Sequence, residues 1–414
     1  MVLLYNISHK DVRFMKHKLM NLSIKFKSLA VFRNLYSQPI FITLQHLLAK
    51  SQGNHVIDCI DSIAEFASVI YEQGGNLSDI VFTLCMEDEN AYVIQSAEGK
   101  KITSSMQSSL RRELLILEEI SQLTLEDIIN DCGIADYIKL LPSWEIKSYD
   151  FQSEYEKRLK NINRCGYGIY AKYHMFYLLE DTITPIAYPD TQRLSDFSDY
   201  ERERSLVVKN TEALLAGEKA SNVLLYGDAG TGKSSTIKAI VNEFSGRGLR
   251  LLEVKKQQLY QIPKVVEELS KNPLKFILFI DDLSFSNNDE NFAALKSILE
   301  GGVSALGNNV VIYATSNRRH LIKEDHQSRL GDEVHLNDTL QETMSLSSRF
   351  GLIITFNRPE KDVYLHIVSK LAQQYNVVME ESELFNKAEA YAIRHHGRSP
   401  RTAKQFIELL KAGI

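Results

Sequence analysis

The chain has 414 residues, of which 44% are hydrophobic and 24% are charged, and its formal net charge is -5. This length exceeds what one ordinary hydrophobic core holds, so we expect two or three domains. The composition excludes a disordered or collagen-like chain, and the slightly acidic balance provides no overall attraction to nucleic acid or to an anionic membrane.

Targeting and membrane signals are not apparent in the sequence. The longest apolar runs, such as Phe276–Ile280, have the length of strands and fall far short of the ~20 residues of a membrane-spanning helix. The N-terminus lacks the continuous apolar segment of a signal peptide. The four cysteines form no closely spaced pair, which argues against a zinc site or a disulfide framework. We therefore expect a cytoplasmic protein with reduced thiols and no membrane partner.

Residues 1–195 contain no recognisable motif, and we expect them to form a mostly helical region. Apolar side chains recur at helical spacing within Val56–Ile70 and within Leu110–Ile120. An aromatic stripe at the same spacing predicts a further helix whose aromatic face packs in the core, with a base-stacking surface as the alternative. Its members are Tyr170, Tyr173, His174 and Tyr177.

The first fifty residues are locally basic and contain a single acid, Asp11. The cationic side chains are either a solvated helix face, a face that complements the acidic residues following it, or a patch that binds nucleic acid or an acidic partner. These cations are Lys10, Arg13, Lys16, Lys18, Lys25, Lys27, Arg33 and Lys50.

A turn-rich stretch ending near Asp199 predicts a domain boundary, and residues 196–357 then alternate apolar runs with amphipathic helices. This pattern predicts an α/β core with a parallel sheet covered by helices on both faces. Residues 358–414 contain three helical patterns and are expected to form a small helical lid, in which Ser399 caps a helix that begins at Pro400. The expected strands are Val223–Tyr226, Leu251–Val254, Phe276–Ile280, Val310–Ala314 and Leu352–Phe356.

A phosphate-binding motif lies at residues 227–234, which follow the pattern Gly-x-x-x-x-Gly-Lys-Ser. Its glycines let successive backbone N–H groups point at a phosphate, and the helix that begins there adds the positive end of its dipole. Lys233 is placed to reach the β- and γ-phosphates, and the Ser234 hydroxyl to bind Mg²⁺. The expected nucleotide-binding residues are Gly227, Asp228, Ala229, Gly230, Thr231, Gly232, Lys233, Ser234 and Ser235.

Two carboxylates, Asp281 and Asp282, follow the apolar run Phe276–Ile280 directly. The carboxyl end of a buried parallel strand lies at the ligand-binding edge of the sheet. We therefore expect Asp281 to hold Mg²⁺ through water, opposite Ser234, and Asp282 to act as the general base for hydrolysis. A turn or helix cap after the strand is the alternative for either residue.

Three further segments resemble those of AAA+ ATPases. Residues 310–317 are similar to the sensor-1 strand, which implies that Asn317 holds the γ-phosphate or the attacking water. Residues 347–351 are similar to the box that supplies an arginine finger to a neighbouring subunit, which implies that role for Arg349 and an oligomeric protein. Residues 397–401 resemble the sensor-2 motif, which implies that Arg401 is the lid arginine.

Each of these assignments has an alternative. Asn317 could be a turn residue, Arg349 a surface ion-pair partner, and Arg401 a solvated side chain, while Arg318 and Arg319 are rival arginine fingers. The chain from residue 195 onward resembles the bacterial AAA+ family known as domain of unknown function 815. That family usually has an acid where this chain has Ser286, which implies weaker hydrolysis here.

The resemblance implies an AAA+ ATPase that binds ATP and Mg²⁺, hydrolyses ATP at an interface of a homo-oligomer, and remodels an unknown protein partner. The absence of a guanine-reading Asn-Lys-x-Asp segment favours ATP over GTP. An ATP-gated binding module with little turnover is a second hypothesis, and a remodeller or loader of nucleic acid is a third.

Overall fold

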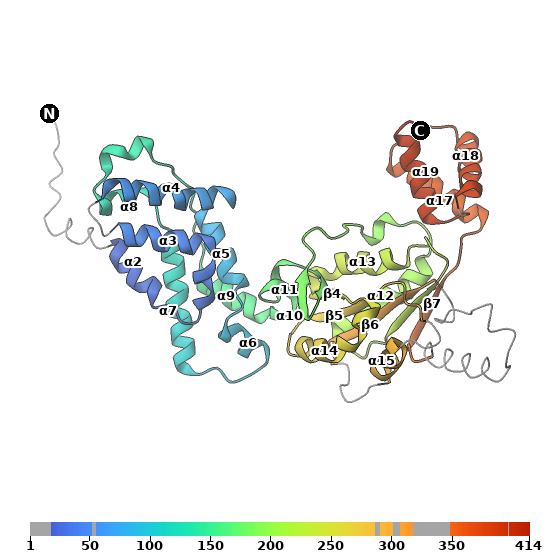
Figure 1. Cartoon of the computed structure of the whole chain (residues 1–414), viewed down its shortest axis with the longest axis horizontal. Coiled ribbons are helices and arrows are strands. Elements are labelled where there is room, and N and C mark those ends of the chain that lie inside the picture. Colours follow the sequence, from blue (N-terminus) through green and yellow to red (C-terminus); the bar gives the residue numbers. More distant parts are fainter. Residues whose placement is uncertain (1–17, 52–54, 286–289, 301–306, 318–347, 396) are drawn as a thin grey trace. The chain divides into compact units, whose positions relative to one another are not determined.

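The computed structural model describes residues 18–51, 55–285, 290–300, 307–317, 348–395 and 397–414. Contacts divide the chain into two compact units, and the division falls at Lys172 apart from residues 163–165, which belong with the second unit. The boundary expected at residue 195 is therefore too late. Residues 175–185 form two strands of the second unit's sheet, which places them with the core and not with the helical region (Figure 1).

The first unit is helical, and most of its helices contribute to one hydrophobic core. The two helices expected from apolar spacing are confirmed as α4 and α7, which bury the predicted faces, including Ile63 and Leu117. The α-helices assigned wholly to this unit are α2 (Lys18–Lys27), α3 (Pro39–Lys50), α4 (Val56–Glu72), α5 (Leu77–Glu87), α6 (Ala91–Ala97), α7 (Ser104–Ser121), α8 (Leu125–Cys132), α9 (Phe151–Lys160) and α11 (Ile169–Lys172).

The aromatic stripe between Tyr170 and Tyr177 is not one helix. Tyr170 lies in the single turn of α11, whereas Tyr177 lies in strand β1 (Met175–Leu179). Strand β1 pairs with β2 (Thr182–Pro185) on one side and with β4 (Leu249–Glu253) on the other. These partners supply the backbone hydrogen bonds that a helix would otherwise make internally, so tertiary pairing overrides the helical spacing.

The described basic residues near the N-terminus are largely paired with acids of the same unit. Lys18 lies 2.5 Å from Asp127, and Lys25 lies 2.7 Å from Glu119. Lys50 contacts Asp58 at 3.3 Å, and Arg33 lies over the ring of Tyr36. These contacts favour the reading in which the basic and acidic segments complement each other.

The second unit is built on a seven-stranded sheet with the order β2-β1-β4-β5-β6-β3-β7, in which every pairing except β1 with β2 is parallel. All five strands expected from the apolar runs are present, which confirms the α/β core. Strand β4 begins two residues earlier than expected. The remaining strands are β3 (Val223–Gly227), β5 (Lys275–Ile280), β6 (Val310–Ser316) and β7 (Leu352–Phe356).

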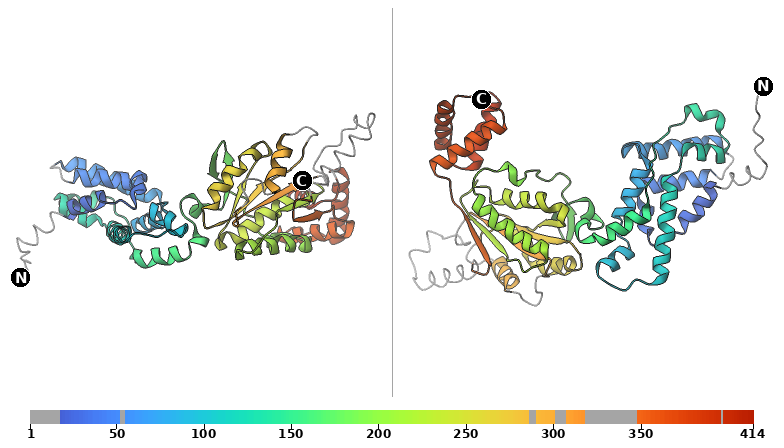
Figure 2. Two further views of the ribbon diagram at one scale, coloured as in Figure 1. Left: turned by 90° about the horizontal axis from the view of Figure 1, so that it is seen from below. Right: turned by 180° about the vertical axis from the view of Figure 1, so that it is seen from behind.

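Helices cover both faces of this sheet, as Figure 2 shows in the view from below. Helices α12 (Glu201–Ala216) and α13 (Lys233–Phe244) pack on one face, and α14 (Ile262–Ser270) and α15 (Glu290–Leu299) lie on the other. Strand β6 is buried along its whole length. A strand buried on both sides has no polar face, which explains the continuous apolar runs in the sequence.

Three helices follow the sheet and form a small hydrophobic cluster of their own: α17 (Lys361–Gln374), α18 (Glu381–Arg394) and α19 (Pro400–Lys411). The predicted cap of α19 is confirmed, because the Ser399 side chain accepts a hydrogen bond from the Thr402 backbone at 3.1 Å and Pro400 opens the helix. None of the described helices combines the length and apolarity required to cross a membrane.

Candidate functional site

The phosphate loop connects the end of β3 to the start of α13. Gly227 has a φ of +136°, and a Cβ atom there would collide with the backbone carbonyl of Phe356 on β7. Only glycine allows both this conformation and this close approach. Gly230 and Gly232 also have positive φ angles, while Asp228 and Ala229 lie at the exposed tip. The loop therefore directs the amino end of α13 toward the edge of the sheet.

Lys233 is buried inside the loop with only 6% of its surface exposed. Its ammonium donates hydrogen bonds to the carbonyls of Gly227 at 2.8 Å and Asp228 at 2.7 Å, and to Oδ1 of Asn317 at 3.0 Å. Burial lowers the pKa of Lys233, and the nearby carboxylate of Asp228 opposes that shift. The cation is thus held at a defined point at the sheet edge.

The acidic pair lies next to this cation. Oδ1 of Asp281 accepts hydrogen bonds from the hydroxyls of Ser234 at 2.6 Å and Thr315 at 2.5 Å. Asp282 has a φ of +49°, a left-handed conformation that aspartate tolerates better than most residues, and its backbone N–H donates to the Thr315 hydroxyl at 3.0 Å. Both carboxylates are exposed to the site.

Asn317 connects the cation to the acidic pair. Its Oδ1 accepts from Lys233, and its Nδ2 donates to Oδ1 of Asp282 at 2.8 Å. The sheet order explains this position, because β6 lies between β3 and β5 and its carboxyl end falls between theirs. The structure therefore brings Lys233, Ser234, Asp281, Asp282 and Asn317 into one connected network.

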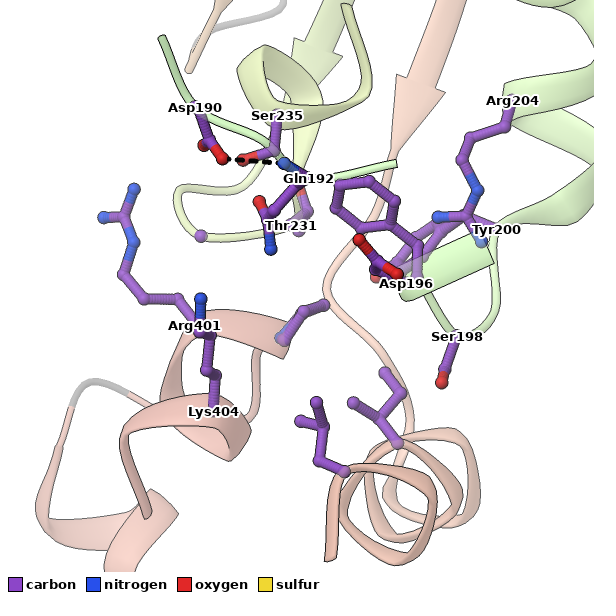
Figure 3. Close-up of a pocket in the computed structure, with 16 residues that line it drawn as sticks. Asp190, Gln192, Asp196, Ser198, Tyr200, Arg204, Thr231, Ser235, Arg401 and Lys404 are labelled. Atoms are coloured by element: carbon purple, nitrogen blue, oxygen red, sulfur yellow. Dashed lines mark hydrogen bonds between the residues drawn. The ribbon is translucent and has the colours of Figure 1, made fainter. Parts of the chain in front are cut away.

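A cavity of about 330 Å³ adjoins the phosphate loop within the second unit. This volume falls within the range of roughly 300–1,000 Å³ that is typical of small-molecule sites. Its apolar lining comes from Phe197 and Tyr200 in the segment between β2 and α12, and from Ile367, Leu371 and Pro400 of the C-terminal helices. Asp190, Gln192, Asp196, Ser198, Arg204, Gly230, Thr231, Gly232, Ser235, Arg401 and Lys404 complete it (Figure 3).

Arg401 lies at this cavity on α19. Its backbone N–H donates to the carbonyl of Gly230 at 3.2 Å, so the start of the lid helix contacts the phosphate loop directly. Figure 3 shows Arg401 and Lys404 on the lid helix, across the cavity from Asp190 and Gln192. The lid thus contributes positive charge beside the loop.

Arg349 lies away from this group. It precedes β7, which pairs in parallel with β3 so that Leu352 is opposite Val223 and Phe356 is opposite Gly227. The length of β7, about 13 Å at ~3.3 Å per residue, therefore separates Arg349 from the phosphate loop of its own chain. Its Nε instead donates to Oε1 of Glu300 at 2.6 Å.

Several predicted features lie outside the described residues. These are the rival fingers Arg318 and Arg319, together with Ser286, at which the chain departs from the family pattern, and Ser347.

A family model described as "Protein of unknown function (DUF815)" matches residues 171–414, which is more than half of the chain. The chain belongs to the DUF815 family. The matched region of this DUF815 chain contains the whole sheet, the phosphate loop and the three C-terminal helices, and it forms an α/β core on a mostly parallel sheet. No curated protein matches the chain.

Among solved structures, the DUF815 chain is similar to the RuvB Holliday junction branch migration motor of Thermotoga maritima, with 18% identity and a TM-score of 0.37. That similarity covers 53% of this chain and 64% of RuvB, so the chain spans less than two thirds of RuvB. It is also similar to AMPPCP-bound DnaA from Aquifex aeolicus, with 18% identity, a TM-score of 0.38, and 55% and 67% of the two chains covered.

Sequence reasoning missed Thr315 and the cavity wall. Thr315 stands two residues before Asn317 on a strand that ends at the site, and that position was a usable signal. The wall residues Asp190, Phe197 and Tyr200 precede the phosphate loop in a turn-rich stretch without a motif. No pattern in the sequence indicated that they line a cavity.

Proposed function

We propose that the DUF815 chain binds ATP with Mg²⁺ and hydrolyses it at an interface between subunits. The observation that carries this proposal is the hydrogen-bonded series from Lys233 through Asn317 to Asp282. It joins a phosphate-binding cation to a carboxylate that can accept a proton from water. A phosphate loop alone would bind nucleotide, but this series adds the groups that hydrolysis requires.

The oxygen atoms at the loop suit Mg²⁺. The Ser234 hydroxyl and Oδ1 of Asp281 already lie 2.6 Å apart, and hard oxygen ligands of this kind are the ones that Mg²⁺ prefers. Ser234 would bind the ion directly and Asp281 through water. When bound, Mg²⁺ neutralises charge on the β- and γ-phosphates.

Asp282 and Asn317 can divide the work of hydrolysis. The amide of Asn317 holds one carboxylate oxygen of Asp282, which leaves the other oxygen to accept a proton from water. Lys233, at 3.0 Å from Asn317, would stabilise negative charge on the γ-phosphate. The chain thus supplies a base, an orienting amide and a cation within one edge of the sheet.

The position of Arg349 supports action on a neighbouring subunit. Because it lies at the edge opposite its own phosphate loop, it cannot reach that loop without moving across the sheet. In a homo-oligomer this edge can face the phosphate loop of the next copy. Arg401, at the lid, would contact the phosphates of the same chain.

The cavity beside the loop supports a nucleoside site. Its aromatic and aliphatic lining suits a purine, and the phosphate loop forms one of its walls. The lid helices α17 and α19 line it as well, so nucleotide binding can be linked to the position of the lid. That link is how we propose the protein acts on an unidentified protein partner.

The test is steady-state ATP hydrolysis over a series of protein concentrations. Turnover per chain should rise with concentration, and both Lys233→Ala and Arg349→Ala should abolish it. Lys233→Ala should also remove nucleotide binding, whereas Arg349→Ala should retain it. Wild-type protein that binds ATP but shows no turnover at any concentration would instead establish an ATP-gated binding module.

Action on nucleic acid is the weaker candidate. The described cations near the N-terminus are engaged with acids, as in the pair of Lys18 and Asp127. Cations already paired within the fold are less available for phosphate contacts. Binding to a heparin column that weakens steeply with salt would revive this candidate.

A further inference from the structure

We propose that Asn242 is a positioning residue for the nucleoside, because it fastens residues 190–192 of the cavity wall to the helix that begins at the phosphate loop. This inference rests on the proposed ATP binding and extends it to the part of the chain that determines affinity for the nucleoside.

The Asn242 side chain makes three hydrogen bonds, which together fix the orientation of its amide. Its Nδ2 donates to the carbonyls of Asp190 at 2.8 Å and Gln192 at 2.7 Å, which uses both of its hydrogens. Its Oδ1 lies 3.1 Å from Nε2 of His174. Since an amide oxygen only accepts, the histidine nitrogen must be the donor. Rotating the amide by 180° would place Oδ1 against two carbonyl oxygens, so no other orientation satisfies the site.

The Asn242 side chain and the phosphate loop lie on the same face of one helix, α13. Asn242 lies seven residues after Ser235 on α13, which corresponds to two turns and about 10 Å of rise. Ser235 lines the cavity, and so do Asp190 and Gln192, which Figure 3 shows close to it. A single rigid element therefore sets the distance between the phosphate loop and this wall.

The segment that forms this wall of the cavity has little regular structure to hold it in place. Residues 186–200 connect β2 to α12, and their only regular element is the short 3₁₀ turn Leu194–Asp196. Ordering a connection of this kind costs backbone conformational entropy at every residue. Two hydrogen bonds from a helix to Asp190 and Gln192 hold the segment where its side chains face the cavity.

Charge identifies which part of the ligand this wall contacts. Asp190 and Asp196 both line the cavity and carry carboxylates, which repel a triphosphate. The same carboxylates can accept hydrogen bonds from ribose hydroxyls or from the amino group of a base. The wall thus suits the nucleoside, while the loop around Lys233 suits the phosphates.

His174 contacts the oxygen of the Asn242 amide, whereas residues 190–192 contact its nitrogen. It lies immediately before β1, and its backbone carbonyl accepts from the Leu251 N–H at 3.0 Å, which fixes the main chain independently of the ring. Another side chain that donates a hydrogen bond to Oδ1 of Asn242 should therefore substitute for the His174 ring. This gives the inference a rescue variant, His174→Gln, alongside the disruptive variant His174→Phe.

The test compares two ligands on the full chain by isothermal titration calorimetry with Mg²⁺. For Asn242→Ala, the Kd for ATP should rise about tenfold through loss of the two hydrogen bonds that hold Asp190 and Gln192, and the Kd for inorganic tripolyphosphate should stay within about twofold. Glu243→Ala, the exposed neighbour on the same helix, should change neither. His174→Phe should reproduce the selective loss, and His174→Gln should restore ATP affinity to within about threefold.

An equal loss for ATP and tripolyphosphate would overturn the inference, because it would mean general damage to the second unit. Unchanged ATP affinity in both Asn242→Ala and His174→Phe would also overturn it, while leaving ATP binding intact. If wild-type protein bound neither ligand, the proposed function itself would fail. The His174 pair decides the matter should Asn242→Ala not fold.

Discussion

Arg349 and Glu300 form an ion pair within one chain, at the edge of the sheet opposite the phosphate loop. The arginine proposed to serve a neighbouring subunit is therefore engaged by its own chain. Both side chains are partly exposed, at 25% and 44%. A pair of this kind stabilises the fold by at most about 1 kcal/mol, so a neighbouring subunit can displace it at low cost.

Glu300→Gln should ease the transfer of Arg349 to a neighbouring subunit. We expect the protein concentration that gives half-maximal ATP turnover to fall about two- to fivefold, because the variant has no ion pair, worth up to about 1 kcal/mol, to break on association. The measurement is turnover per chain against protein concentration. Glu212→Gln removes a comparable exposed pair with Arg247 and should have no effect. Lower turnover in Glu300→Gln would mean that the pair holds Arg349 in its working position.

Asn317→Ala should separate binding from hydrolysis. It removes the donor to Asp282 and the acceptor for Lys233, so we expect turnover to fall about 100-fold while the Kd for ATP stays within about threefold. Single-turnover assays and ATP titration measure the two effects. The matched control is Asn308→Ala, because Asn308 is an exposed asparagine that precedes the amino end of β6, away from the site. Unchanged turnover in Asn317→Ala would reduce Asn317 to a turn residue.

Gly227→Ala should destabilise the second unit well beyond the usual effect of a strained glycine. The added Cβ meets the carbonyl of Phe356 in addition to adopting a φ of +136°. Strain and overpacking of this kind cost about 2–5 kcal/mol together, which corresponds to a fall in Tm of roughly 5–15 °C for a unit of this size. Gly217 also has a positive φ but open space around it, so Gly217→Ala should cost only about 1 kcal/mol. Equal Tm values for the two variants would mean that a Cβ atom at position 227 does not collide with the Phe356 carbonyl.

Asp88→Asn should stabilise the first unit at neutral pH. Burial raises the pKa of Asp88 to about 6, against a partly compensating hydrogen bond from Asn90. Between the ordinary value of about 4 and 6, the folded state binds more protons than the unfolded state, so the free energy of unfolding falls as pH rises through this window. The neutral amide should recover about 2 kcal/mol at pH 7 and flatten the pH dependence.

Denaturant unfolding of the first unit between pH 4 and pH 7 measures this effect. Asp79 is the control of opposite sign, because its hydrogen bonds with Lys147 and Tyr149 lower its pKa. Asp79→Asn should therefore remove stability throughout this range, and the loss should shrink only below about pH 4, as pH falls from the ordinary pKa of an aspartate through the lowered pKa of Asp79. A steeper pH dependence in Asp88→Asn than in wild type would contradict the assignment.

The sequence by itself determined the phosphate loop and the α/β core. The glycines and Lys233 of the loop act through local backbone geometry, which depends on neighbours in the chain. The fully apolar strands and the cap at Ser399 are local signals of the same kind, and the structure contains both. The residues of the acidic pair were also identified from their place at the end of an apolar run.

Only the tertiary structure decided which distant residues meet. The order of β3, β6 and β5 places Asn317 between Lys233 and Asp282, and the parallel pairing of β7 places Arg349 at the opposite edge. The strands β1 and β2 and the wall around Asp190 likewise depend on partners elsewhere in the chain. Their positions follow from strand pairing and packing across long sequence separations, and local spacing does not encode these contacts.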